Sequence, residues 1–373
     1  MDEDEGGRRV KSARHGRGRR WRARWVDAEG REHARSFERK PDAQHYLDKV
    51  TTAVITGNYV DPRAGQQTFR DYAEHWRTIQ VHRPSTAAYT ETMLRRHAYP
   101  TLGDTPLSRL QPSDVQAWVK LISATLAPST VGIVHGVVSG ILRSAVRDRR
   151  IVGNPCEGTK LPKVQRAQVA PLSIAEVQGL TAVMPGRYRA LVTLAAGTGM
   201  RQGECLGLTV DRVDFLRREL RVDRQLVTPP KGAPAFGPPK TSASVRTIPL
   251  PAAVVDALAA HLAAYPADEL MFTTEDGTPI RRPSFSRVWR PAATRAGLST
   301  DRTFHDLRHF YASLLIRHGE SVKTVQARLG HANAAETLDT YSHLWPDSDD
   351  RTRAAVDAAF TTAADPLRTA GTR

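Results

Sequence analysis

Cysteine is nearly absent from this sequence. Only Cys156 and Cys205 occur among its 373 residues, and they stand far apart in the chain. Two isolated thiols exclude a disulfide framework and the ligand spacing of a zinc site, and they suit the reducing cytoplasm. Long apolar runs are lacking as well, because no stretch approaches 18 apolar residues, so no membrane span is expected. No secretory signal is expected either, because no apolar stretch follows the basic run near the N-terminus.

Several familiar catalytic motifs are also lacking. The sequence has no serine–histidine–aspartate order, no phosphate-binding nucleotide loop and no carboxylate cluster suited to Mg²⁺ near its polar motifs. The chemistry must therefore be sought among other residue types.

Acidic residues are outnumbered by basic ones. The chain has 54 Lys and Arg against 39 Asp and Glu, which gives a formal net charge of +15 and an isoelectric point near 10.2. An excess of this size favours contact with a polyanion through counterion release. Nucleic acid is the expected partner, and a ribosomal or membrane-surface role is the alternative.

The length predicts two or three domains. Residues 1–62 form the first, with nine Lys or Arg and no acid between positions 8 and 24. Residues 21–26 and 33–37 alternate apolar and basic side chains, which predicts a β-hairpin with one apolar and one basic face. A helix is expected over 41–55. A disordered basic tail is the alternative for residues 1–17.

Two further domains follow, and helical periodicity dominates both. Residues 67–155 are predicted to form an all-α module. Residues 170–345 combine helices with expected strands at 219–222, 245–250 and 270–272, which predicts an α+β domain with a small antiparallel sheet. Helices are expected over 303–318, 322–329 and 334–341, and residues 346–373 form a tail with one more amphipathic helix at 351–364.

Arg201 follows a glycine-rich break, Gly197-Thr198-Gly199, and begins a short helix. Unpaired amides at a helix start favour an anion. Glu204, three residues further on, is expected to hold the arginine in place, and a purely structural pair without a ligand is the alternative for both residues.

His305 and Arg308 stand three residues apart in the string His305-Asp306-Leu307-Arg308-His309, so a helix would place them on one face. Two arginine forks can grip one phosphate.

Tyr341, ten residues after His331, is the candidate nucleophile. Its phenol needs to lose a proton near positive charge, because its ordinary pKa is about 10.

A leaving oxygen needs a proton donor. Lys240 stands directly before the expected strand at 245–250, where a loop lysine could reach over bound DNA as general acid. Lys231 in the same loop is the competing candidate.

These motifs resemble those of the tyrosine recombinases, also called phage-type integrases. The resemblance implies an arm-binding domain, a helical core-binding domain and a catalytic domain. It also identifies six catalytic residues, in this order: Arg201, Lys240, His305, Arg308, His331 and Tyr341. The residues expected to contact DNA are all arginines: Arg19, Arg20, Arg22, Arg24, Arg95, Arg96 and Arg147. Taken singly, each of the arginines of the helical module is more often part of a solvated face.

The resemblance further implies a cytoplasmic homotetramer that binds double-stranded attachment sites and exchanges strands through a 3′-phosphotyrosyl link. It implies no metal and no cofactor, and an excisionase or a DNA-bending host factor as a possible partner. The tail could dock on its own domain or on a neighbouring protomer. A type IB topoisomerase, a resolvase of the chromosome-dimer type and a non-catalytic DNA-binding regulator are the alternatives.

Overall fold

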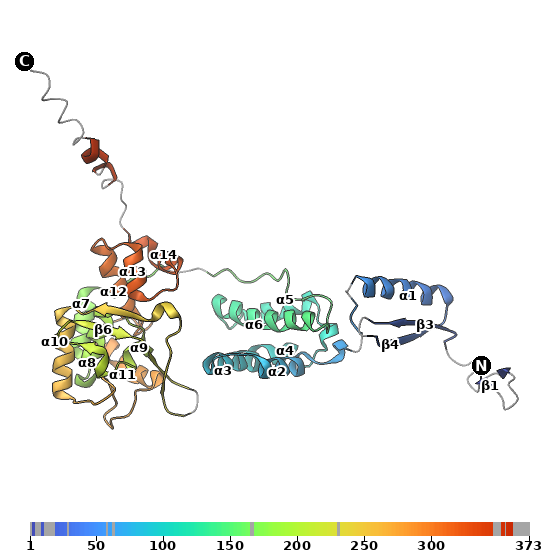
Figure 1. Ribbon diagram of the computed structural model, residues 1–373, viewed down its shortest axis with the longest axis horizontal. Helices are drawn as coiled ribbons and strands as arrows, with labels where there is room; N and C mark the ends of the chain where they lie inside the picture. The colour runs from blue at the N-terminus through green and yellow to red at the C-terminus, as the bar shows by residue number, and fades with distance from the viewer. Residues whose placement is uncertain are drawn as a thin grey trace, which may run out of the picture. The chain divides into compact units, whose positions relative to one another are not determined.

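The computed structural model describes residues 2–3, 9–10, 19–27, 30–56, 59–61, 64–164, 168–229, 232–345, 352–354 and 356–360. The chain divides into two compact units, residues 1–165 and 166–373, and each is considered by itself (Figure 1). Helices dominate both units and strands are short. The structure thus confirms the predicted mostly helical, multidomain fold with small β elements.

The first unit begins with a hairpin covered by a helix. Strands β1 (Asp2–Glu3) and β2 (Arg9–Val10) form a minor pair. Strands β3 (Trp21–Val26) and β4 (Glu32–Phe37) form the main antiparallel hairpin, and α1 (Lys40–Ile55) packs on it. The predicted hairpin and helix are confirmed.

Side chains alternate between the two faces of this hairpin. Trp25 and Phe37 lie on one face, and both rings contact Tyr46 of α1. Arg22 and Arg24 lie on the other face, exposed, with only Ser36 and Ala34 opposite them in the register. The predicted division into an apolar and a basic face is therefore observed.

A helical bundle completes the first unit (Figure 1). Its elements are α2 (Phe69–Ile79), α3 (Pro84–Met93), the π-helical turn η2 (Leu94–Ala98), α4 (Tyr99–Leu102), α5 (Pro112–Ile122) and α6 (Pro128–Arg147).

By length and composition α6 could cross a membrane, with a mean hydropathy of 1.3, contrary to the expectation that no such stretch exists. Its apolar side chains line the bundle core together with Trp118 and Phe69, which accounts for the composition.

The second unit packs helices around a small sheet. The helices are α7 (Ile174–Val183), α8 (Gly186–Thr198), α9 (Gln202–Leu206), α10 (Ala252–Ala264), α11 (Arg282–Arg295), α12 (Asp306–Arg317), α13 (Val322–Leu329) and α14 (Ala334–Tyr341). Strands β5 (Val213–Asp214), β6 (Glu219–Val222) and β9 (Arg246–Pro249) pair in that order, and β7 (Gln225–Val227) pairs with β8 (Ala235–Gly237), all antiparallel.

Three local expectations differ from the structure. Residues 270–272 form no strand and contribute only a bridge between Leu270 and Thr209. Helix α12 begins at Asp306 and not at Thr303, because the Asp306 carboxylate accepts hydrogen bonds from the Thr303 amide and hydroxyl and so caps the turn before it. In the tail, residues 352–354 and 356–360 are helical, whereas the rest of 346–373 lies outside the described residues.

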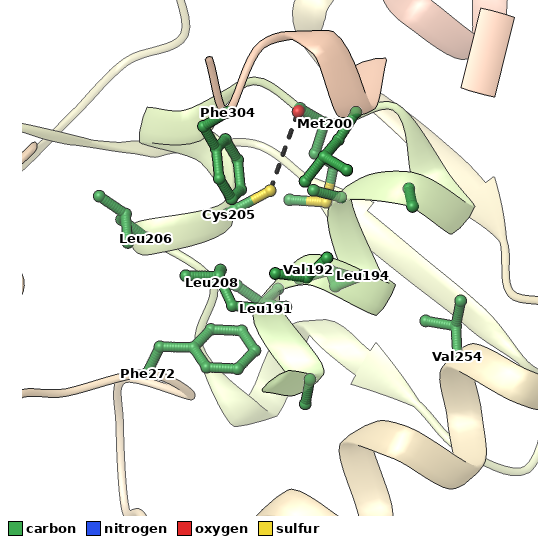
Figure 2. Close-up of a cluster of buried hydrophobic side chains, with 14 of the residues drawn as sticks. Leu191, Val192, Leu194, Met200, Cys205, Leu206, Leu208, Val254, Phe272 and Phe304 are labelled. Atoms are coloured by element: carbon green, nitrogen blue, oxygen red, sulfur yellow. Dashed lines mark hydrogen bonds between the residues drawn. The ribbon is translucent and has the colours of Figure 1, made fainter. Parts of the chain in front are cut away.

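The core of the second unit surrounds α8. Figure 2 shows Leu191 and Leu194 of this helix among buried side chains that include Phe272 and Cys205. The Cys205 thiol is fully buried and donates to the Met200 carbonyl at 3.8 Å. Burial raises the pKa of this thiol, so the cysteine acts as a small apolar residue, as expected from the sequence.

Gly199 ends α8 in the left-handed conformation, with φ of 62°. A Cβ there would lie 2.4 Å from Cδ1 of Tyr311 and 3.0 Å from a methyl of Leu329. The glycine therefore allows α8 and α12 to approach closely, next to Arg201.

We predict that Gly199→Ala destabilises the second unit more than Gly297→Ala does. Both glycines have positive φ, but the space around Gly297 is open. The control substitution should cost about 1–2 kcal/mol of backbone strain, and Gly199→Ala about 1–3 kcal/mol more for the steric clash. Urea unfolding, with hydrogen exchange to assign the transition to this unit, measures both, and equal losses would contradict the prediction.

Candidate functional site

The predicted polar residues converge from separate parts of the second unit. Arg201 is the N-cap of α9, Arg308 lies on α12, His331 follows the end of α13, and Tyr341 is the last residue of α14. Contacts of α8 with α9 and α12, and of α12 with α13, bring these elements together.

Glu204 is the anchor of the site. Its carboxylate is only 2% exposed and accepts from Arg201 Nη1 at 3.1 Å and from Arg246 Nη2 at 2.9 Å. Burial by itself would raise the pKa of this carboxyl, but Arg246 and then Arg201 lower it, and the pKa falls below its ordinary value. The support role predicted for Glu204 from the sequence matches this geometry.

Arg201 is fixed in three directions. Beyond Glu204, its guanidinium donates to Ser244 Oγ at 3.1 Å and to the Gly330 carbonyl at 3.2 Å. Gly330 has φ of 66°, and a Cβ at this position would meet Arg246 and the backbone at Ala243 about 3 Å away. The glycine thus allows the turn after α13 to lie against the arginines. Arg201 keeps 23% of its side chain exposed, so a ligand can reach it.

Arg308 is more deeply buried than Arg201. It is 2% exposed, and its Nη1 donates to the Gly199 carbonyl at 2.7 Å. Its Nη2 is buried and has no hydrogen-bond partner within the part of the chain that the structure describes. Burial, followed by the positive charge of Arg201, lowers the pKa of Arg308 to about 9. A buried guanidinium with an unused donor favours an anionic ligand.

Tyr341 lies beside two histidines, His309 and His331. It is 1% exposed, its ring stacks on His331 with centroids 6.5 Å apart, and its hydroxyl lies 2.8 Å from Nδ1 of His309. Burial raises the pKa of this phenol to about 12, although Arg308 opposes the shift. The phenol is therefore protonated at neutral pH.

The three imidazoles are neutral at pH 7. Burial and the surrounding arginines lower the pKa of His331 to about 3. His305 has an exposed surface, yet desolvation by the surrounding protein, followed by the nearby His309 and Arg308, lowers its pKa to about 4. Burial also lowers the pKa of His309. Neutral imidazoles can accept protons or hydrogen bonds.

Lys240, Lys231 and the predicted DNA-binding arginines remain to be located. Lys240 is exposed and lies between β8 and β9. Lys231, its competitor, lies outside the described residues. All seven arginines expected to contact DNA are exposed. Three of them donate hydrogen bonds within their domain, Arg19 to the Ser36 carbonyl, Arg95 to Glu91 and Arg147 to Ser144. Arg20 lies over the Trp21 ring. No group of three or more His, Cys, Asp or Glu suited to a metal occurs among the described residues.

Sequence reasoning missed three participants. Arg246, on β9, is buried and completes the pair of cations on Glu204, and Ser244 bonds Arg201. Nothing in the local sequence distinguishes Arg246 from a surface arginine on a strand. His309 is part of the string His305–His309, but the sequence analysis gave it no role. Its position directly after Arg308 is the feature of the sequence that could have indicated one.

The chain is similar to known proteins over most of its length. Residues 172–347 match the model of the phage integrase family, and residues 67–161 match that of the phage integrase central domain. A putative prophage phiRv2 integrase of Mycobacterium tuberculosis is 29% identical over 87% of this chain and 88% of that protein. A tyrosine recombinase XerD of Corynebacterium glutamicum is 30% identical over 60% of this chain and 73% of that protein.

Solved structures share the fold. The Tn1549 transposon integrase in complex with transposon right end DNA has a TM-score of 0.68 and 20% identity, covering 79% of this chain and all of that chain. A lambda integrase tetramer bound to a Holliday junction has a TM-score of 0.59 and 18% identity, covering 84% and 94%.

We predict that Glu204→Gln lowers the free energy of unfolding of the second unit by about 3–5 kcal/mol, because it leaves buried guanidinium groups without a carboxylate. The pKa of Glu204 is lowered by folding, so its contribution is present above the ordinary pKa and is lost as the pH falls through the folded-state value. Urea unfolding at several pH values should show this loss in the wild type and not in the variant. Glu219→Gln, at an exposed position, is the control.

Proposed function

The chain belongs to the phage integrase family of tyrosine recombinases, DNA-binding enzymes that cut and rejoin DNA strands at specific sites, and we propose that Tyr341 is its nucleophile. In this proposal the Tyr341 oxygen attacks the scissile phosphorus and forms a 3′-phosphotyrosyl link while the 5′-oxygen leaves. The single observation that carries it is the position of this phenol beside Arg308, whose buried Nη2 has an unused donor within the described residues.

Charge neutralisation is the proposed task of the arginines. Arg201, Arg246 and Arg308 share one nearby carboxylate, Glu204, so the cluster carries excess positive charge. A phosphodiester entering beside Arg201 would receive hydrogen bonds from the free donors of Arg201 and Arg308, and the same groups would stabilise the additional negative charge of the transition state. In this mechanism these arginines do the electrostatic work, with no metal or cofactor in the proposed chemistry.

Lys240 is the proposed general acid, and His305 and His331 are the proposed supporting groups. The lysine is exposed on the segment between β8 and β9, where bound DNA could meet it. Its ammonium would protonate the 5′-oxygen as the bond to phosphorus breaks. His331 stacks on Tyr341 and is held by Thr337, so it would orient the phenol, whereas exposed His305 would contact the phosphate.

Exchange of strands follows from the chemistry of the link. The phosphotyrosine stores the energy of the cleaved bond, so a free 5′-hydroxyl of a partner strand can attack it without a nucleotide cofactor. We propose that the protein acts in the cytoplasm as a tetramer on two attachment sites and integrates a mobile element. The tetramer of the related lambda integrase on a Holliday junction supports this stoichiometry.

DNA binding by the first unit is proposed to use its basic surfaces. Arg22 and Arg24 project from the exposed face of the hairpin, where the opposite residues are small and leave room for a groove or backbone. Arg19 and Arg20 precede this face. Arg95, Arg96 and Arg147 would contact the core site from the helical bundle.

Tyr341→Phe is expected to keep DNA binding and to abolish covalent complex formation on a nicked suicide substrate, because only the attacking oxygen is removed. The covalent complex is measured by denaturing electrophoresis, and a second duplex in the mixture reports joined products. Tyr311→Phe, at a buried tyrosine of the same cluster, is the control and should cleave normally. Cleavage by the Tyr341 variant would disprove the assignment.

Substitution of the exposed hairpin arginines should weaken DNA binding in a salt-dependent way. Arg22→Gln and Arg24→Gln should each reduce the slope of log affinity against log salt by about 1 if each arginine contacts a phosphate. Arg35→Gln is the matched control, because Arg35 lies on the opposite face over the Tyr46 ring. Fluorescence anisotropy at several salt concentrations measures the slopes, and equal slopes for all variants would contradict the prediction.

A further inference from the structure

The hydroxyl of Tyr341 has a defined partner in the site. Nδ1 of His309 lies 2.8 Å from it, and the two ring centroids are 5.6 Å apart in an edge-to-face arrangement. His309 follows Arg308 directly on α12, and Leu307 and Phe310 of this helix are buried in the core. The imidazole is therefore held at the oxygen that would react.

The other groups near this oxygen are less suited to take its proton. His331 presents its ring face to Tyr341, its Nδ1 is bonded to Thr337 at 2.8 Å, and its Nε2 lies 3.6 Å from Glu336. Arg308 can only donate. His305 contacts the His309 ring at 4.9 Å between centroids, one ring further from the phenol.

We propose that His309 is a catalytic residue, the acceptor of the Tyr341 proton during DNA cleavage. This inference rests on the proposed function, because it assumes that Tyr341 attacks. In the resting state the imidazole is neutral with its proton on Nε2, and the phenol donates its hydrogen bond to Nδ1.

Cleavage exchanges one bond to phosphorus for another and moves two protons. The Tyr341 oxygen forms a bond to phosphorus, its proton passes to Nδ1, and His309 becomes an imidazolium. The bond from phosphorus to the 5′-oxygen breaks, and that oxygen takes its proton from Lys240. In ligation the same steps run in reverse, and the imidazolium returns the proton to the phenol as it leaves phosphorus.

Proton transfer must be concerted with attack. The phenol is a weak acid in the resting site, but bonding of its oxygen to phosphorus makes the proton strongly acidic. The charged or titratable groups facing His309 are Asp306, Arg308 and His305 of its own segment, Arg302 before the helix, and Tyr341. The pKa of His309 is now low through burial, and an anionic phosphate bound between the arginines would raise it.

Two substitutions of His309 test the proposal. His309→Asn keeps an oxygen acceptor near the position of Nδ1 without a basic nitrogen, and His309→Phe keeps the ring volume. Both should slow single-turnover covalent complex formation about 100-fold or more and leave DNA affinity unchanged. Their rates should rise with pH across the whole range, whereas the wild-type rate should level off once His309 is neutral. His318→Phe, at the exposed end of the same helix, is the control.

A substrate with sulfur in place of the bridging 5′-oxygen separates the two proton transfers, because a thiolate leaves without protonation. This substrate should restore cleavage by Lys240→Ala and leave the His309 variants slow. Equal rescue of both would overturn the inference. A wild-type rate for His309→Asn, or a wild-type pH profile in the slowed variants, would reduce His309 to a positioning residue and overturn it as well.

Failure of this inference is distinguishable from failure of the proposed function. If Tyr341→Phe still forms the covalent complex, the nucleophile is wrong. If Tyr341→Phe is inactive while both His309 variants cleave at the wild-type rate, only the role of His309 is wrong.

Discussion

The constraint on which this site depends is the imbalance of buried charge around Glu204. One carboxylate, 2% exposed, accepts hydrogen bonds from Arg201 and Arg246, and the more deeply buried Arg308 adds a third guanidinium nearby. Repulsion and desolvation oppose such an arrangement, and they are relieved when an anion enters. The cluster therefore suits an anionic ligand, such as the phosphodiester of the proposed reaction, and the uncompensated charge lowers the stability of the protein without that ligand.

The three arginines can lie around one carboxylate because two glycine turns approach them closely. Gly199 and Gly330 both adopt positive φ and lie where a side chain would collide with the packed helices or with the arginines. Their carbonyl oxygens then accept hydrogen bonds from Arg308 and Arg201. The same two turns therefore position the helices and hold the cations, which links the stability of the second unit to its chemistry.

Neutral imidazoles complement the arginines in this site. The pKa values of His305, His309 and His331 are all lowered, so at neutral pH these rings add no further positive charge to the cluster. They instead offer lone pairs and flat surfaces beside Tyr341. In the proposed mechanism the guanidinium groups neutralise charge, and groups whose protonation can change transfer the protons.

The linear sequence by itself determined the helices, the hairpin and the order of the motifs, because periodicity, capping residues and glycine breaks act over a few residues. It also identified Arg201, Arg308, His331 and Tyr341 as a set, since that order of residue types is distinctive. Only the tertiary structure decided that Arg246 is a buried partner of Glu204 and that His309 faces the phenol. Those contacts join residues 42 and 32 positions apart, and local propensities carry no information about which side chains meet across such distances.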